Sequence, residues 1–193
     1  MINLDTLSKI FLDYLKNTSP IEYNDKTEQL AKLSIERNKK LWELEDSARM
    51  IELGSEHVSK IKQEIDKNNQ IRNDLIREMD TVITDQIGIS SGEQKLFYSE
   101  SPGMIIDRLS ILFIKLSAIR NLLTIILEKD LQKEYQEKEK IIMNQINTIG
   151  SFLDYYLTQL ANKKAFFEIM QPVKIYNDNR IKKYIKILKN NLN

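Results

Sequence analysis

The chain has 193 residues, with 29 basic and 28 acidic side chains, one histidine and no cysteine. These counts exclude disulfides, cysteine-based metal centres and histidine-rich metal sites, and the formal net charge of +1 gives no overall attraction to nucleic acid. Five glycines and three prolines are too few for the turns of a many-stranded sheet or for a glycine-rich nucleotide fold, so the composition favours long helices.

Apolar residues spaced three and four positions apart predict three helices in the first half of the chain. The first covers residues 4–16, within an N-terminal segment of residues 1–20. The second starts near Asn24 or Asp25 and runs to about Leu53, and Gly54 suits the position that follows a helix end. The third helix then runs over residues 55–87.

The second half of the chain begins with residues 88–103, which hold three of the five glycines and predict one long irregular loop. Residues 104–127 are apolar nearly all round, so we expect this fourth helix at the centre of a bundle. The charged residues 128–140 are expected in solvent, and a heptad-like pattern over residues 142–160 returns the chain to the core. The sequence therefore predicts a single all-α domain over residues 1–193, a bundle of five or six helices.

The last segment, residues 171–193, carries six basic residues and one acidic residue, a net charge of +5. Tyr176, Asn177 and Asp178 predict a turn, and the residues after them predict a short helix. A basic amphipathic helix can bind a membrane surface, nucleic acid or an acidic partner. We expect this one instead to pack on the bundle through Ile181, Ile185 and Leu188, with its lysines in water.

No membrane-spanning segment is expected. The N-terminal residues contain acid where a signal peptide needs base. The most apolar part of the chain still contains four charged residues: Asp107, Arg108, Lys115 and Arg120. We therefore expect a cytoplasmic protein.

Two polar stripes lie beside the apolar seams of the second and third helices. The first stripe consists of Asn38, Trp42, Glu45 and Arg49, with Asp46 next to Glu45. The second consists of Asp66, Asn69 and Asn73, flanked by Gln70, Arg72 and Asp74. Arg37, Asn68 and Arg72 also interrupt the seams themselves, which is unusual for a core.

The start of the fourth helix suggests an anion site. Ser101 suits the N-cap, Pro102 the first helical position, and Gly103 the next. Free backbone N–H groups there, together with the helix dipole, favour a phosphate or carboxylate. Arg108 follows on the same helix, and Lys115 lies two turns beyond it. With Arg49 or Arg72 from the other helices, these groups would complete an anion site.

Four carboxylates complete the candidate site as ligands for a divalent cation such as Mg²⁺: Glu45, Asp46, Asp66 and Asp107. The alternative is a satisfied ion-pair network, in which the same carboxylates pair with basic side chains inside the bundle. Those basic partners would be Arg49, Arg72, Arg108 and Lys115.

Four segments resemble, in the same order, those of a bacterial family catalogued only as a domain of unknown function. Residues 38–49 follow the pattern N-x-x-L-W-x-x-E-D-x-A-R, and residues 65–74 follow I-D-x-x-N-Q-x-R-N-D. Residues 100–115 follow E-x-P-G-x-x-x-D-R-L-S-I-L-x-x-K, and residues 174–178 follow K-x-Y-N-D. The chain departs from the family by carrying Glu43 after Trp42, where members often have a histidine, and Asn179 in place of a proline.

The resemblance implies an all-helical fold and a family often encoded beside glycosyltransferase and lipopolysaccharide-type surface-glycan genes. Our first hypothesis is a polar cleft that binds a phosphorylated or nucleotide-sugar ligand, with Mg²⁺, in surface-glycan metabolism. If the protein is an enzyme, metal-assisted phosphoester or pyrophosphate cleavage is the expected reaction class. The alternative is a non-enzymatic scaffold whose long helices pair with a partner protein or with a second copy.

Overall fold

The computed structural model describes residues 2–16, 23–88, 96–171 and 179–190. The described residues form six α-helices: α1 (Leu4–Leu15), α2 (Lys26–Ala48), α3 (Ser55–Ile87), α4 (Pro102–Leu123), α5 (Lys129–Ala161) and α6 (Lys182–Asn190). Two 3₁₀ turns, η1 (Ile51–Leu53) and η2 (Asn179–Ile181), and two short strands, β1 (Leu96–Phe97) and β2 (Ala165–Phe166), complete them. The predicted all-α single-domain bundle is confirmed.

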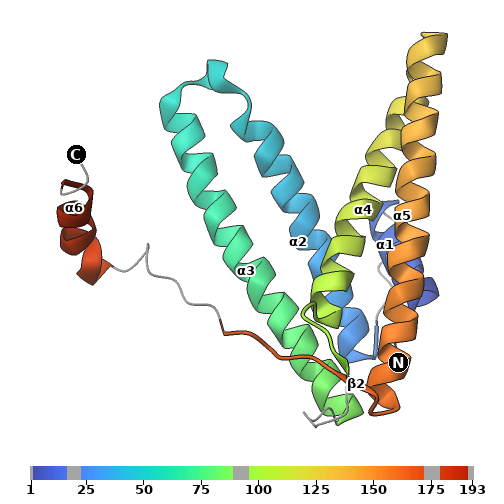
Figure 1. Ribbon diagram of the computed structural model, residues 1–193. Helices are drawn as coiled ribbons and strands as arrows, with labels where there is room; N and C mark the ends of the chain where they lie inside the picture. Colours follow the sequence, from blue (N-terminus) through green and yellow to red (C-terminus); the bar gives the residue numbers. More distant parts are fainter. Residues whose placement is uncertain (1, 17–22, 89–95, 172–178, 191–193) are drawn as a thin grey trace.

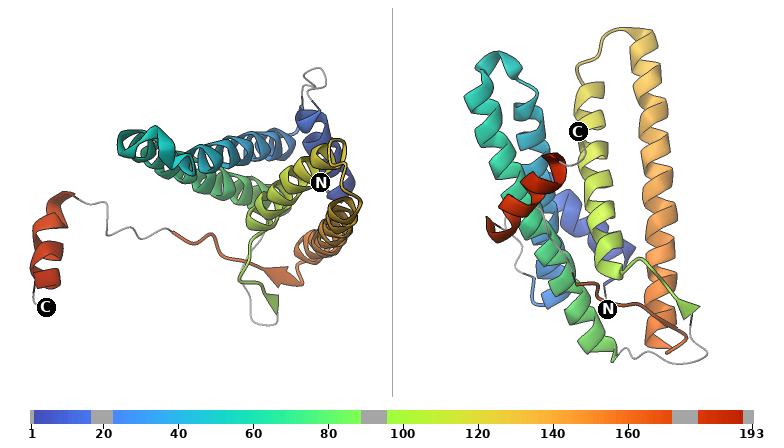
Figure 2. Two further views of the ribbon diagram at one scale, coloured as in Figure 1. Left: turned by 90° about the horizontal axis from the view of Figure 1, so that it is seen from above. Right: turned by 60° about the vertical axis from the view of Figure 1, so that its left-hand side comes forward.

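Two antiparallel helical hairpins form the body of the molecule. The α2–α3 hairpin and the α4–α5 hairpin meet at one end and diverge toward their turns, so that the ribbon has the outline of a V (Figure 1). The two hairpins remain distinct in both views of Figure 2. Helix α2 packs on α3 and on α4, and the short α1 packs on α2, α4 and α5. Helices α2, α3 and α4 thus come together between the two hairpins.

The core fills the closed end of the V. Its fully buried side chains come from five helices: Leu7 and Phe11 of α1, Leu30 and Ile35 of α2, Met79 of α3, Ile105, Ile106 and Leu109 of α4, and Leu153, Tyr156 and Leu157 of α5. The rings of Phe11 and Phe113 meet edge to face with centroids 5.4 Å apart. This packing holds the two hairpins together at one end and leaves their turns in solvent.

The helix starts follow local rules that can be read in the sequence. Asn3 caps α1 and accepts a hydrogen bond from the N–H of Thr6, and Asp25 caps α2 and accepts from the N–H groups of Thr27 and Glu28. Ser101 caps α4, with Pro102 at its first position. Helix α3 ends at Gly88, whose φ of +65° is a left-handed conformation that favours glycine.

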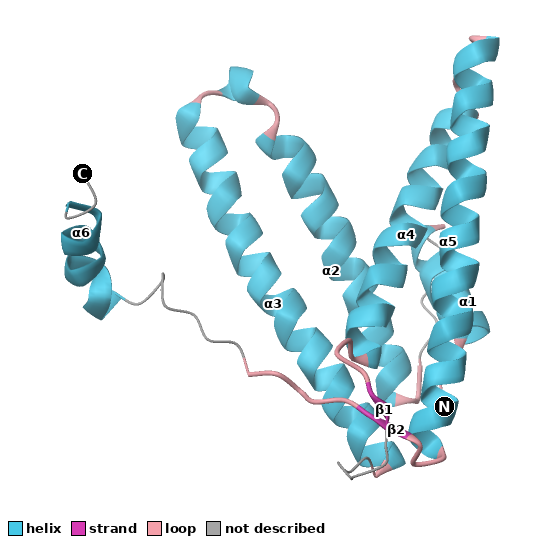
Figure 3. Cartoon of the chain, in the orientation of Figure 1, coloured by secondary structure: helices cyan, strands magenta, loops and turns pink. Residues whose placement is uncertain are grey.

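A pair of strands that the sequence analysis did not predict closes the base of the bundle (Figure 3). Strands β1 and β2 are parallel, with Leu96 opposite Ala165 and Phe97 opposite Phe166. β1 lies inside the predicted loop, of which residues 89–95 are outside the described residues. The pairing brings the ring of Tyr98 to 4.5 Å from that of Tyr156 on α5.

Two predicted helix ends were wrong. Helix α2 ends at Ala48 instead of continuing to residue 53, because the chain turns through η1, where Ile51 is 77% exposed. Helix α4 ends at Leu123, and it is central only over its first four turns, since Leu122, Ile125 and Leu127 are exposed. The apolar composition of residues 117–127 therefore did not place them in the core.

The charged residues 128–140 are mostly exposed, as expected, but from Lys129 onward they belong to the same 33-residue helix as the heptad-like pattern. Ion pairs one turn apart support this stretch, between Lys138 and Glu134 and between Lys140 and Glu137.

The predicted short C-terminal helix is present as α6, but its expected packing on the bundle through Leu188 was wrong. Leu188 does not pack on the bundle: it is 64% exposed, and Tyr184 and Ile187 are also more than half exposed. The predicted turn at residues 176–178 lies outside the described residues. Within the described part of the chain, no helix is long and apolar enough to cross a membrane.

Candidate functional site

A cleft of about 240 Å³ opens between α2, α3 and α4, beyond the packed core. Its lining consists of Asn38, Leu41, Trp42, Glu45, Asp46 and Arg49 from α2 and its C-cap, Asn69 and Arg72 from α3, and Ile111 and Ile114 from α4. The structure thus brings together the whole polar stripe predicted on the second helix and two of the residues predicted on the third. The three apolar residues of α2 and α4 give the cleft a nonpolar wall.

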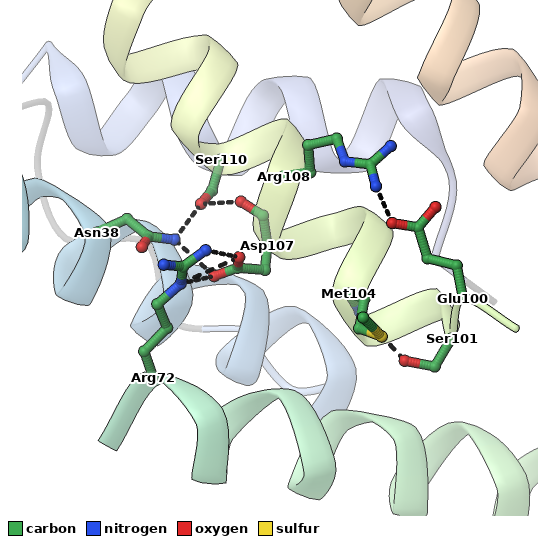
Figure 4. A network of polar contacts seen from close by, with 8 residues as sticks. All are labelled: Asn38, Arg72, Glu100, Ser101, Met104, Asp107, Arg108 and Ser110. Atoms are coloured by element: carbon green, nitrogen blue, oxygen red, sulfur yellow. Dashed lines mark hydrogen bonds and ion pairs between the residues drawn. The ribbon is translucent and has the colours of Figure 1, made fainter. Parts of the chain in front are cut away.

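Arg72, at the floor of the cleft, is held by a buried carboxylate that lies behind the lining (Figure 4). Asp107 of α4 is only 4% exposed and accepts two hydrogen bonds from Nε of Arg72, at 2.9 and 3.1 Å, and one from Nη2 at 2.5 Å. Nδ2 of Asn38 donates to the same carboxylate at 2.8 Å and to the Ser110 hydroxyl at 2.7 Å. The hydroxyl of Ser110 in turn donates to the Asp107 carbonyl oxygen. The network fixes α2, α3 and α4 relative to one another.

Arg72 remains open to the cleft although Asp107 holds it. The hydrogen bond to Asp107 raises the pKa of its guanidinium, and burial partly opposes that effect. The side chain of Arg72 is 30% exposed, and among the described residues no group accepts a hydrogen bond from its Nη1 atom. A guanidinium held along one edge keeps its remaining donors in a fixed direction, as recognition of a phosphate or carboxylate requires.

The mouth of the cleft is more polar and more exposed. Trp42 packs part of its ring on the core and leaves the rest in the cleft lining. Arg49 donates from Nη1 to Asp46 at 3.0 Å, and both side chains are more than half exposed. Glu45 is exposed and has no ion-pair partner among the described residues. The mouth therefore offers two carboxylates, one guanidinium and an indole.

The two other polar residues that interrupted the predicted seams pair with each other. Nη1 of Arg37 on α2 donates to Oδ1 of Asn68 on α3 at 2.5 Å, and Nδ2 of Asn68 donates to the Glu64 carbonyl oxygen. Asn68 is 4% exposed. Their irregular place in the seams thus reflects a polar contact between the two helices of the hairpin.

Several predicted site residues lie outside the cleft. Asp66 is exposed on α3, Gln70 donates to Asp74, and Lys115 is exposed on α4. Arg108 forms an ion pair with Glu100. Asn73 and Ser101 line a second pocket, at the closed end of the V.

The predicted anion site at the start of α4 is already filled by a side chain of the protein. The N–H of Gly103 donates to Oδ1 of Asp80 at 2.7 Å, and the N–H of Met104 donates to the hydroxyl of Ser101. The expectation of free N–H groups was therefore wrong. Asp80 was not among the predicted site residues, because nothing in its local pattern on α3 indicates that it faces another helix.

Asp80 also lines a second pocket of about 250 Å³ at the closed end of the V. The other members of its lining are Asn73, Ile76, Arg77, Ser99, Ser101, Met104, Glu168, Ile169 and Met170. Asp80 is 3% exposed; burial raises its pKa to about 6, and the hydrogen bonds from Ser101 and the Gly103 N–H oppose that rise. Burial and the neighbouring Asp80 also raise the pKa of Tyr156.

The four predicted metal-binding carboxylates do not meet. Asp107 is enclosed by Arg72 and Asn38, Asp66 is exposed outside the cleft, and only Glu45 and Asp46 share the cleft mouth. In the described ranges of the chain, no group of three or more histidine, aspartate or glutamate side chains could hold a metal ion. The expected four-carboxylate site was therefore wrong, and a cation at this cleft would need oxygen ligands from elsewhere.

Comparison with known families gives one match. A family model described as a protein of unknown function, DUF4254, matches residues 28–169. The chain belongs to the DUF4254 family. No curated protein and no solved structure matched the chain. The DUF4254 match covers α2 to β2 and therefore every residue that lines the cleft.

Proposed function

We propose that the cleft between α2, α3 and α4 binds a small phosphorylated ligand of the nucleotide-sugar class. The observation that carries the proposal is the Arg72–Asp107 pair at the cleft floor, where a buried carboxylate holds a guanidinium whose Nη1 atom has no acceptor among the described residues. A buried ion pair contributes little net stability compared with apolar packing, so its place at the floor of an open cleft supports a role in binding.

The remaining lining suits the other parts of such a ligand. The indole of Trp42 offers a flat apolar face of the kind on which a sugar or a base packs, and Leu41, Ile111 and Ile114 extend that surface. Asn38 and Asn69 provide amide groups for hydroxyl or base hydrogen bonds. In this arrangement Arg72 and Arg49 contact the phosphate.

A magnesium ion fits this proposal only as a partner of the ligand. Mg²⁺ is commonly held by one or two carboxylates together with substrate phosphates, and Glu45 and Asp46 are the two carboxylates at the cleft mouth. If the protein catalyses a reaction, the class that suits these groups is metal-assisted phosphoester or pyrophosphate cleavage. The role in surface-glycan metabolism rests on what the family resemblance implies.

The test is a thermal-shift panel on the purified protein with Mg²⁺ or Mn²⁺, alone and together with nucleotides, UDP-sugars and GDP-sugars. A ligand at about 100 times its Kd stabilises the fold by about 2.7 kcal/mol, which raises Tm by several degrees at this chain length. We expect a rise with one nucleotide class that is larger when Mg²⁺ is present.

Matched variants assign the effect to the cleft. Arg49→Gln should abolish most of the rise, whereas Arg120→Gln should leave it unchanged, since Arg120 is also an exposed arginine but is paired with Glu139 outside the cleft. Glu45→Gln should reduce the Mg²⁺ dependence. Glu43→Gln should not, since Glu43 lies two residues earlier on the same helix and is paired with Lys39. A panel without any rise would contradict the proposal.

The alternative function, a scaffold that binds a partner protein, has an observation of its own. The turns of both hairpins carry exposed large apolar residues: Met50, Ile51 and Leu53 at one turn, and Leu122, Ile125 and Leu127 at the other. Exposed apolar clusters of this kind are typical of protein interaction sites. If the ligand panel shows no rise, these two turns are the surfaces on which a partner should be sought.

A further inference from the structure

Among the helices that the structure describes, α6 is the most strongly amphipathic. Because an α-helix turns by about 100° per residue, the apolar residues of this helix fall on one side and its lysines on the other. The apolar side consists of Tyr184, Ile185, Ile187 and Leu188, continued by Ile181 of η2, and Lys183 and Lys186 lie on the polar side. Such a separation suits a helix that lies at a boundary between an apolar and an aqueous phase.

The apolar side of α6 is not used by the bundle. Tyr184 is 56%, Ile187 54% and Leu188 64% exposed. Figure 1 and the left-hand view of Figure 2 show α6 apart from the two hairpins. Since these three side chains do not pack on the described bundle, they are available to a surface outside it.

The charge of this segment indicates the nature of that surface. Residues 179–190 contain Arg180 and four lysines and no acidic residue, although the chain as a whole has a net charge of only +1. A nucleic acid would match the lysines but leaves the apolar side without a function. An anionic lipid surface matches both, because its headgroups attract the lysines and its acyl boundary takes up the apolar side chains.

We propose that α6 binds an anionic membrane surface, with Tyr184, Ile187 and Leu188 at the acyl boundary and Lys183 and Lys186 at the lipid headgroups. A helix this short is only marginally stable in water, so the binding is weak, reversible and dependent on anionic lipid. Each lysine near such a surface contributes about a fivefold increase in affinity.

The test is co-sedimentation of the full-length chain with vesicles of phosphatidylcholine alone or of phosphatidylcholine mixed with phosphatidylglycerol. We expect binding to the mixed vesicles that weakens as salt is raised, and little binding to the neutral ones. The double variant Lys183→Glu/Lys186→Glu should lower the affinity more than tenfold. Lys62→Glu/Lys67→Glu, which makes the same charge change at exposed positions of α3, should have little effect.

A second variant separates lipid binding from plain charge attraction. Ile187→Ser/Leu188→Ser keeps every charge and removes exposed side chains, so the bundle should fold normally, and binding to the mixed vesicles should still fall several-fold. Unchanged binding by this variant would overturn the proposal and indicate a polyanion such as nucleic acid instead. Absence of binding to the mixed vesicles, or equal losses in the α3 and α6 charge variants, would also overturn it.

Discussion

Asp107 is the residue on which the geometry of the cleft depends most. Its carboxylate is buried and accepts hydrogen bonds from Arg72 and Asn38, so Asp107→Asn leaves the Arg72 charge without its partner. We expect this variant to lower the free energy of unfolding by about 3 kcal/mol, measured by urea denaturation. A loss below about 1 kcal/mol would contradict the close pairing of Arg72 with Asp107.

The same reasoning limits what Asp107 can reveal about ligands. Because it anchors three helices, its replacement destabilises the protein whether or not the cleft binds anything. The exposed residues at the mouth, Glu45 and Arg49, are the better positions for binding tests, since their ion pairs contribute little to stability.

Asp80 gives the protein a specific pH dependence. Burial raises its pKa from 3.8 to about 6, so the folded state binds this proton more tightly than the unfolded state. The stability that this proton contributes is fully present below about pH 4 and is lost as the pH rises through about 6. The full contribution, from a difference of about two units between the folded and unfolded pKa values, amounts to about 3 kcal/mol.

The variant Asp80→Asn removes the titration and keeps an oxygen that can accept from the Gly103 N–H. We therefore expect the variant to gain about 2 kcal/mol relative to the natural protein when both are moved from about pH 4 to about pH 7. Urea denaturation at the two pH values measures this difference. Parallel pH profiles for the two proteins would show that Asp80 does not titrate in this range.

At the scale of single elements, the start of α4 depends on the absence of a side chain at Gly103. A Cβ atom there would lie 2.7 Å from Oδ1 of Asp80 and 2.7 Å from the backbone oxygen of Ile76. The backbone of α3 cannot give way as a flexible side chain can, so Gly103→Ala should cost about 2 kcal/mol or more. Thermal or urea denaturation measures the loss, and a variant as stable as the natural protein would contradict the close approach of α3 and α4.

The elements themselves were largely predictable, because their signals are local. Caps at Asp25 and Ser101 and a helix end near Gly88 can be read directly from the sequence. The ends of α2 and α4 were not predictable, since apolar residues such as Ile51 and Ile125 continue the pattern into turns that stay exposed. The strands β1 and β2 were missed because each is two residues long and is defined only by its distant partner.

At the scale of the whole molecule, three segments distant in the sequence form one cleft. The stripe on α2 was predicted as a unit, because a helix fixes which of its residues share a face. Which residues of α3 and α4 join that stripe depends on how the hairpins cross, and spacing within one helix does not contain that information. Arg72 and Asp107 therefore meet at the floor, while Asp66 and Arg108, predicted on equal grounds, lie elsewhere.

The divergence of the hairpins is the other property of the molecule that local patterns did not give. The exposed apolar residues at the two turns and the separate α6 mean that much of the apolar surface lies outside the core. Two proposals, a membrane surface for α6 and a partner protein for the hairpin turns, address different parts of that surface. Each can fail without affecting the other.

The most direct test of ligand binding in the cleft uses a probe that the chain already contains. Trp42 is the only tryptophan, and it lines the cleft, so its fluorescence reports on that site without background from other tryptophans. Titration of the protein with UDP-sugars and GDP-sugars in the presence of Mg²⁺ should give a saturable change in Trp42 emission for one nucleotide class, weakened by Arg49→Gln and unchanged by Arg120→Gln. Emission that stays constant across all of these ligands would contradict a binding role for the cleft.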